Sequence, residues 1–238
     1  MEPYLLPVLF LAVAAAFTLS ASAGFGGSLI LVPTLALVLG TKSGVALAAL
    51  LLAANNLVKV FAYRKTLPYR KAAVVIVLVA AGAFLGAKLL VSAPERAVTI
   101  AVIVSFAAAF LIESLDLTRW RRASSPVLAF CAGATSGFSG TSGPLKGLAV
   151  RGLALDRLHL VGALSLASLV GDATKTAVWT DAALLAGNDY LVALACLPLM
   201  FFATFLGRRF NNRIGERGYT GLFWTVMLGY TGRLLTGL

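Results

Sequence analysis

Seven long apolar segments alternate with short polar stretches along the chain. They lie near residues 4–22, 44–63, 72–91, 97–115, 158–180, 189–207 and 218–236. Each has close to the ~20 residues that an α-helix needs to cross a bilayer. Three further apolar runs, at about 28–39, 126–136 and 144–150, are too short to do so. The pattern predicts an all-α fold, that of a polytopic α-helical membrane protein.

Polar landmarks between these runs occur twice in the same order. In the first half they are Gly24-Phe25-Gly26-Gly27, Asn56-Leu57-Val58-Lys59, Phe84-Leu85-Gly86 and Glu95-Arg96. In the second half they are Gly137-Phe138-Ser139-Gly140, Asp172-Ala173-Thr174-Lys175, Phe205-Leu206-Gly207 and Glu216-Arg217. The loop after the second landmark is basic in the first copy and acidic in the second copy. Matched segments with opposite flanking charge indicate two repeats of inverted topology.

The repeats define the expected domain organisation. Residues 1–115 form the first repeat, 116–125 a cytoplasmic linker, and 126–238 the second, inverted repeat. Each repeat is expected to contain a Gly-rich helical hairpin, built from two tilted helices or from a re-entrant pair, and three transmembrane helices. An odd number of net crossings in each half inverts the second copy.

Composition and charge agree with a multi-pass protein of the plasma (inner) membrane. Hydrophobic residues make up 60% of the chain and charged residues 12%, and the mean hydropathy is +0.93. The loops 64–71, 116–125, 151–157 and 208–217 together hold thirteen Lys or Arg, whereas the opposite side holds three. This asymmetry predicts that those four loops are cytoplasmic. The net charge of +11 is therefore explained by topology and lipid headgroups, and nucleic acid is not an expected partner.

Two Gly-rich segments form the first group of candidate substrate-binding residues, since irregular backbone at membrane depth must be buried or line a cavity. Ser28 can cap the apolar run that follows it, and Thr141 or Ser142 can cap a helix containing Pro144. A helix start inside the membrane favours an anion. Alternatively the glycines only permit close helix packing, as we expect of Gly82 and Gly86. The candidates are Gly24, Phe25, Gly26, Gly27 and Ser28, with Ser136, Gly137, Phe138, Ser139, Gly140, Thr141 and Ser142.

The second group of candidates consists of Asn55, Asn56 and Lys59 in the first repeat and Asp172 and Lys175 in the second. An ionisable residue inside an apolar run is costly, so it is expected to be paired and is often functional. Asp172 and Lys175 are three positions apart and can neutralise each other on one helix face. Two simpler interpretations stay open, in which this pair only holds helices together and Lys59 extends to the cytoplasmic surface.

At these residues the chain resembles the sulfite exporter TauE/SafE family of membrane proteins. The resemblance spans nearly the whole chain and rests on the order and duplication of the four landmarks. The first Gly-rich segment departs from the Gly-Gly-Gly form common in the family, because Ser28 follows Gly26 and Gly27. The resemblance implies an exporter of sulfite, sulfonates or related organic anions.

Together these features predict export of a small oxyanion by alternating access, with the anion held by the Gly-rich turns and its charge balanced by Lys175 and Lys59. The alternatives are a passive anion channel and a non-transporting membrane assembly subunit. No catalytic arrangement, metal site or cofactor motif is present in the sequence, so an enzyme is not expected. The expected partners are a small anionic substrate and membrane lipids, and the sequence leaves a homodimer open.

Overall fold

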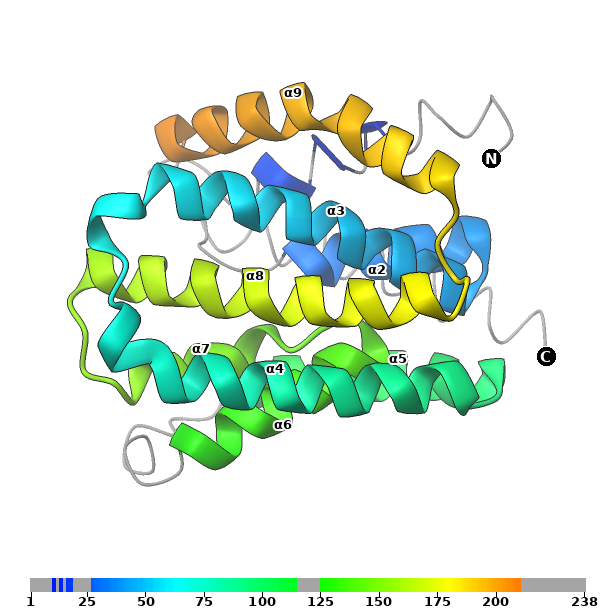
Figure 1. Ribbon diagram of the computed structural model, residues 1–238, viewed down its shortest axis with the longest axis horizontal. Coiled ribbons are helices and arrows are strands. Elements are labelled where there is room, and N and C mark those ends of the chain that lie inside the picture. Colours follow the sequence, from blue (N-terminus) through cyan, green and yellow to red (C-terminus); the bar gives the residue numbers. More distant parts are fainter. Residues whose placement is uncertain (1–9, 12, 15, 19–26, 115–124, 211–238) are drawn as a thin grey trace.

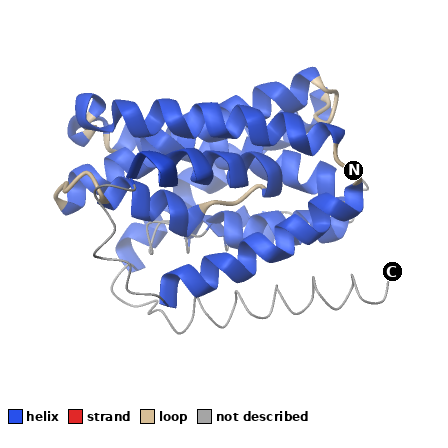
Figure 2. Ribbon diagram, turned by 90° about the horizontal axis from the view of Figure 1, so that it is seen from below, coloured by secondary structure: helices blue, strands red, loops and turns tan. Residues whose placement is uncertain are grey.

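The computed structural model describes residues 10–11, 13–14, 16–18, 27–114 and 125–210. These residues form helices joined by short loops, with no strand among them (Figures 1 and 2). The predicted all-α class is confirmed for this part of the chain. The elements are α2 (Gly27–Leu39), α3 (Thr41–Ala62), the 3-10 helix η2 (Arg64–Thr66), α4 (Tyr69–Ser92), α5 (Glu95–Ser114), α6 (Ser125–Ser139), α7 (Gly143–Arg151), α8 (Arg157–Asp181) and α9 (Gly187–Phe210).

The long helices coincide with the predicted apolar segments. Among the described residues, α3, α4 and the Gly187–Leu206 part of α9 are long and apolar enough to cross a membrane. Helix α8 is as long, with 25 residues, and contains Asp172 and Lys175. The first predicted segment lies mostly outside the described residues and the last lies wholly outside them, as do Glu216 and most of the linker 116–125.

The loops separate to the two ends of the helix bundle (Figure 1). The η2 segment and the connection from α7 to α8 lie at one end, where residues 67–71, which follow η2, line one pocket together with residues of that connection. At the other end the start of α3 contacts the start of α5. Glu95 accepts a hydrogen bond there from the Thr41 backbone N–H at 2.7 Å. The exposed basic residues Arg64, Lys65, Arg70, Lys71 and Arg151 are all at the first end. Two of the four loops predicted to be cytoplasmic, 64–71 and 151–157, thus lie at the same end, and the other two lie mostly outside the described residues.

Helices α4 and α6 pack backbone against backbone through glycines spaced four residues apart. A Cβ atom added to Gly82 or Gly86 of α4 would lie 2.2 or 2.1 Å from a carbonyl oxygen of α6. A Cβ atom on Gly133 or Gly137 of α6 would lie 2.2 or 2.3 Å from a carbonyl oxygen of α4. The expected packing role of Gly82 and Gly86 is confirmed, and Gly137 takes part in the same contact. This contact joins the first predicted repeat to the second.

Helix α3 is the centre of the fold, and its segment 45–52 is buried throughout. It contacts α2, α8 and α9, while α8 also contacts α4. Large apolar side chains point outward from α4, α5 and α9, among them Val77, Leu89, Ile100, Leu194 and Phe202. Lipid tails are as apolar as these side chains, so this surface suits a protein embedded in a bilayer.

Candidate functional site

Four charged side chains are buried in the described part of the chain, and they form one group. Lys59 is 9% exposed, Lys146 7%, Asp172 4% and Lys175 0%. They come from α3, α7 and α8, and Asp172 is within electrostatic range of both Lys59 and Lys146. We call these four residues the lysine cluster. With three lysines and one aspartate, the cluster has an excess of two positive charges when all four are ionised.

Asp172 of α8 uses both carboxylate oxygens, one toward Lys175 in the same helix and the other toward Asn56 of α3. Its Oδ1 lies 2.8 Å from the Lys175 Nζ, and its Oδ2 accepts a hydrogen bond of 2.8 Å from the Asn56 Nδ2. Asn56 and Asp172 occupy matching positions in the two sequence repeats. The predicted pairing of Asp172 with Lys175 is confirmed, and equivalent positions of the repeats meet between α3 and α8.

Lys175 ties α8 to the end of α6 and to the turn that follows it. Its Nζ donates to the Ser136 Oγ at 2.9 Å and to the Gly140 carbonyl oxygen at 3.4 Å, in addition to its ion pair with Asp172. An ammonium group has three donors. These three partners account for all of them, so Lys175 supplies positive charge and holds the Gly-rich turn against α8.

The turn between α6 and α7 contacts the other Gly-rich segment. Gly140 has φ +80°, a conformation that favours glycine, and a Cβ atom there would also crowd a side-chain atom of Val45 at 3.0 Å. Thr141 comes next, and its Oγ1 lies 2.9 Å from the Oγ of Ser28 in α2. Helix α2 begins at Gly27, whereas Gly24, Phe25 and Gly26 lie outside the described residues. The described parts of the two Gly-rich segments are therefore neighbours.

The predicted capping by hydroxyl side chains is wrong for Ser142 and is not seen for Ser28. Ser142 occupies the N-cap position of α7, but its side chain makes no capping hydrogen bond. Its ψ angle of 14° is far from the extended value usual at an N-cap. Ser28 lies inside α2, and its hydroxyl is bonded to Thr141. Both residues remain close to the turn without capping a helix.

Three buried side-chain atoms of the described residues have no hydrogen-bond partner. They are the Nδ2 of Asn55, the Oγ of Ser142 and the Oγ1 of Thr176. All three groups can donate a hydrogen bond. Two belong to predicted substrate-binding residues, and the third follows Lys175 directly. Leaving a buried donor without a partner costs about 1–3 kcal/mol, so each of these groups has unused capacity to bind an acceptor.

Lys146 is the member of the lysine cluster that the sequence analysis did not select. Its Nζ donates to the Ser168 Oγ at 3.2 Å, and Ser168 is four residues before Asp172 on α8. The signal in the sequence is a single lysine inside the apolar run 144–150, directly after the second Gly-rich segment. That run is too short to cross a membrane, so the sequence alone did not mark the lysine as buried at membrane depth.

The remaining predicted residues lie around the cluster without direct contact to its charges. Ser139 donates to the Thr135 carbonyl oxygen at 2.8 Å, within α6. Phe138 packs against the main hydrophobic core. Asn55 accepts a hydrogen bond of 3.3 Å from Thr204 of α9. The structure thus brings Asn56, Lys59, Ser136, Gly140, Asp172 and Lys175 together with Lys146.

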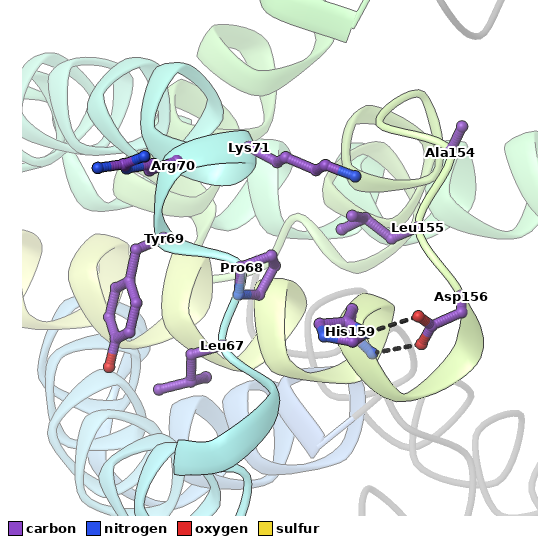
Figure 3. A pocket seen from close by; sticks show the side chains of 9 residues that line it. All are labelled: Leu67, Pro68, Tyr69, Arg70, Lys71, Ala154, Leu155, Asp156 and His159. Carbon is purple, nitrogen blue, oxygen red and sulfur yellow. Dashed lines mark hydrogen bonds and ion pairs between the residues drawn. The ribbon is translucent and has the colours of Figure 1, made fainter.

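A separate pocket of about 480 Å³ lies at the end of the bundle that carries the basic loops (Figure 3). It is formed by residues 67–71 after η2, by Ala154, Leu155 and Asp156 before α8, and by His159 in the first turn of α8. Asp156 accepts hydrogen bonds from the backbone N–H of His159 at 3.0 Å and lies 2.6 Å from its ring Nδ1. None of the predicted substrate-binding residues lines this pocket.

Comparison with protein families assigns residues 9–234, nearly the whole chain, to the family described as Sulfite exporter TauE/SafE. No curated protein and no solved structure matches the chain significantly.

Proposed function

Because the chain belongs to the sulfite exporter TauE/SafE family, we propose that it exports small sulfur-containing oxyanions, such as sulfite or a sulfonate, by alternating access. The lysine cluster and the turn between α6 and α7 form the anion site in this proposal. The observation that carries it is the burial of three lysines around a single aspartate.

Charge balance is the first argument for an anion site. Burying an ion without a counter-ion is expensive, so buried charges in proteins are normally paired. Within the cluster only Asp172 is negative, and it is bonded to Lys175 and Asn56. A bound oxyanion would add negative charge beside the buried lysines.

The hydrogen-bonding groups around the cluster are the second argument. Asn55, Ser142 and Thr176 each have a buried donor without a partner. The start of α7 adds backbone N–H groups, because the first turn of any helix leaves such groups unpaired and carries the positive end of the helix dipole. An oxyanion is an acceptor that suits all of these donors.

Burial of the site favours a transporter over an open channel. Lys175 is fully enclosed by protein and the other cluster residues are nearly so, which corresponds to a closed state between outward and inward access. Movement of one helix group against another would open the site to each side in turn. We propose that α4 and α6 move as one unit, since their backbones are in direct contact.

Export of an anion needs no obligatory coupling ion. An inside-negative membrane potential contributes ~2.3 kcal/mol per charge per 100 mV to outward movement of an anion. The basic loops at one end of the bundle support a cytoplasmic location for that end, in a multi-pass protein of the inner membrane.

Flux of sulfite from reconstituted liposomes tests this function. Vesicles preloaded with sulfite, sulfate, thiosulfate, methanesulfonate or acetate are followed with and without a potassium diffusion potential. We expect efflux of at least one sulfur oxyanion above that of empty liposomes, accelerated by an inside-negative potential. The absence of flux for every anion in the panel, from protein that is monodisperse and inserted, would contradict the proposal.

A further inference from the structure

We propose that the pocket at the basic end of the bundle binds the phosphate-bearing headgroup of an anionic phospholipid, with Lys71 and Arg70 as its charged ligands. The site is separate from the lysine cluster, because none of the residues that line the pocket belongs to that cluster. The inference therefore goes beyond the proposed export of an anion and does not depend on it.

The walls of this pocket are held together by direct packing. Helix α8 contacts the end of η2 so closely that a Cβ atom added to Gly162 would lie 2.6 Å from the Thr66 carbonyl oxygen. The connection before α8 is closed by a hydrogen bond of its own, from the Leu153 N–H to the Val150 carbonyl oxygen at 3.0 Å. The pocket of about 480 Å³ is therefore a defined cavity between two packed segments.

Two basic side chains line the pocket, and the carboxylate among its lining residues is bonded to a histidine. Figure 3 shows Lys71 extending across the pocket toward Leu155, whereas Arg70 points in the opposite direction. Asp156 accepts a hydrogen bond of 3.0 Å from the His159 backbone N–H and lies 2.6 Å from the ring Nδ1. The lining thus presents two cationic groups to an anion, while its carboxylate is engaged at the start of α8.

The start of α4 adds backbone donors to these side chains. Pro68 occupies the N-cap position of α4, and no side chain caps this helix start. The first turn of a helix has N–H groups without intrahelical acceptors and carries the positive end of the helix dipole, which together favour a phosphate. The start of α8, by contrast, is capped by Asp156. Of the two helix starts at the pocket, that of α4 supports the basic side chains.

The exposed face of α4 runs from the pocket along apolar side chains. Arg70, Val74 and Val77 are spaced by four and three positions, so they lie on one face of the helix. Val74 is 61% exposed and Val77 65%, and α4 is long and apolar enough to cross a membrane. Tyr69, which is also exposed, is of a type enriched at membrane–water interfaces. Acyl chains can therefore pack along α4 while the headgroup occupies the pocket, which favours a lipid over a soluble phosphate.

Binding of defined lipids to the purified full chain, measured by native mass spectrometry, tests the inference. The chain is titrated with phosphatidylglycerol, which is anionic, and with phosphatidylcholine, which is zwitterionic. We expect the wild-type chain to bind one phosphatidylglycerol at least tenfold more tightly than phosphatidylcholine, because basic pockets between membrane helices bind anionic headgroups. Glycerophosphoglycerol, the same headgroup without acyl chains, and inorganic phosphate should both bind at least tenfold more weakly than the lipid.

Two double variants separate a binding site from general attraction to a negative membrane surface. Arg70→Gln with Lys71→Gln removes two charges from the pocket. Arg64→Gln with Lys65→Gln removes two exposed charges from η2, which does not line the pocket. General attraction depends on the number of basic residues near the surface, so it would be weakened equally by both. We expect the Kd for phosphatidylglycerol to rise about tenfold or more in the first variant and less than about threefold in the second.

A third variant fills the pocket without changing its charge. Leu155→Trp places a larger side chain where Leu155 faces Lys71 (Figure 3), and it should also weaken phosphatidylglycerol binding about tenfold. Thermal unfolding without added lipid checks that every variant is folded.

The inference is overturned if the two double variants bind phosphatidylglycerol equally, or if the pocket variants bind it as the wild-type chain does. Equal affinity for the lipid and for its soluble headgroup would also overturn it, because that result indicates a soluble phosphate compound as the ligand.

Discussion

The hydroxyl of Ser28 lies 2.9 Å from the hydroxyl of Thr141, although 113 positions separate them in the chain. This contact joins α2 to the turn before α7, and it brings the two Gly-rich segments of the sequence to one place. Asn56 and Asp172, which also occupy matching positions in the repeats, are joined at 2.8 Å. Two such contacts are expected if the halves of the chain are related by an axis that passes near the lysine cluster.

The topology predicts opposite accessibility for the two ends of the bundle. A single cysteine at Lys65, within η2, and another at Asn188, at the start of α9, are introduced separately into a chain with Cys131 and Cys196 replaced by Ala. We expect Lys65→Cys to react with a membrane-impermeant maleimide only from the cytoplasmic side and Asn188→Cys only from the outside. Labelling of both from the same face would exclude the inverted repeat.

The turn between α6 and α7 is predicted to bind the anion. Replacing Thr141 or Ser142 with Leu should abolish sulfite flux while the protein still inserts into the membrane, because a bulky apolar group displaces donors beside the cluster. Thr135→Leu is the matched control, since the Thr135 hydroxyl bonds only to carbonyl oxygens of its own helix. If all these variants transport normally, the turn has only a packing role.

The contact between α4 and α6 predicts that replacing glycine with alanine has very different effects on stability at two positions. Gly137→Ala should destabilise the protein by about 2 kcal/mol or more, because its Cβ would lie 2.3 Å from the Ala83 carbonyl oxygen. In α7, a Cβ atom added at Gly147 would meet no atom of another part of the structure within 4 Å. Gly147→Ala should therefore be neutral or stabilising by up to about 1 kcal/mol. Thermal unfolding in detergent measures both. Equal midpoints for the two variants would contradict the observed packing.

The sequence predicted the helices and part of the site, and the exceptions have physical reasons. Asp172 and Lys175 were recognisable because charged residues rarely occur in a run long enough to cross a membrane. Lys146 was not recognisable in this way, because its apolar run is short. Its burial depends on packing against α8, which the local sequence does not reveal. The spacing of Gly82 and Gly86 predicted a close helix contact, but which helix packs there depends on the whole fold. The predicted capping by Ser142 is wrong because the local sequence does not determine the backbone angles of this residue.

The pair of Asp172 and Lys175 is predicted to support binding as well as structure. Lys175→Gln alone should lower stability by about 3–5 kcal/mol and raise the KM for the anion or stop its flux, because it leaves Asp172 buried without its ion pair. The double replacement Asp172→Leu with Lys175→Met should restore folding, since removing both partners of a buried pair is often tolerated. It should not restore transport, because the turn loses its anchor at Ser136 and Gly140, although the net charge of the cluster is unchanged. A stable double variant that exports at the original rate would leave the pair only a structural role.

Locating a bound anion tests the central claim most directly. Selenite is a heavier analogue of sulfite, and its anomalous scattering identifies its position in crystals of the full chain. The account predicts a selenium peak between α3, α7 and α8, within hydrogen-bonding distance of the Lys146 Nζ and close to the turn at Gly140 to Ser142. A peak found only in the pocket between residues 67–71 and 154–159, with none at the lysine cluster, would contradict it.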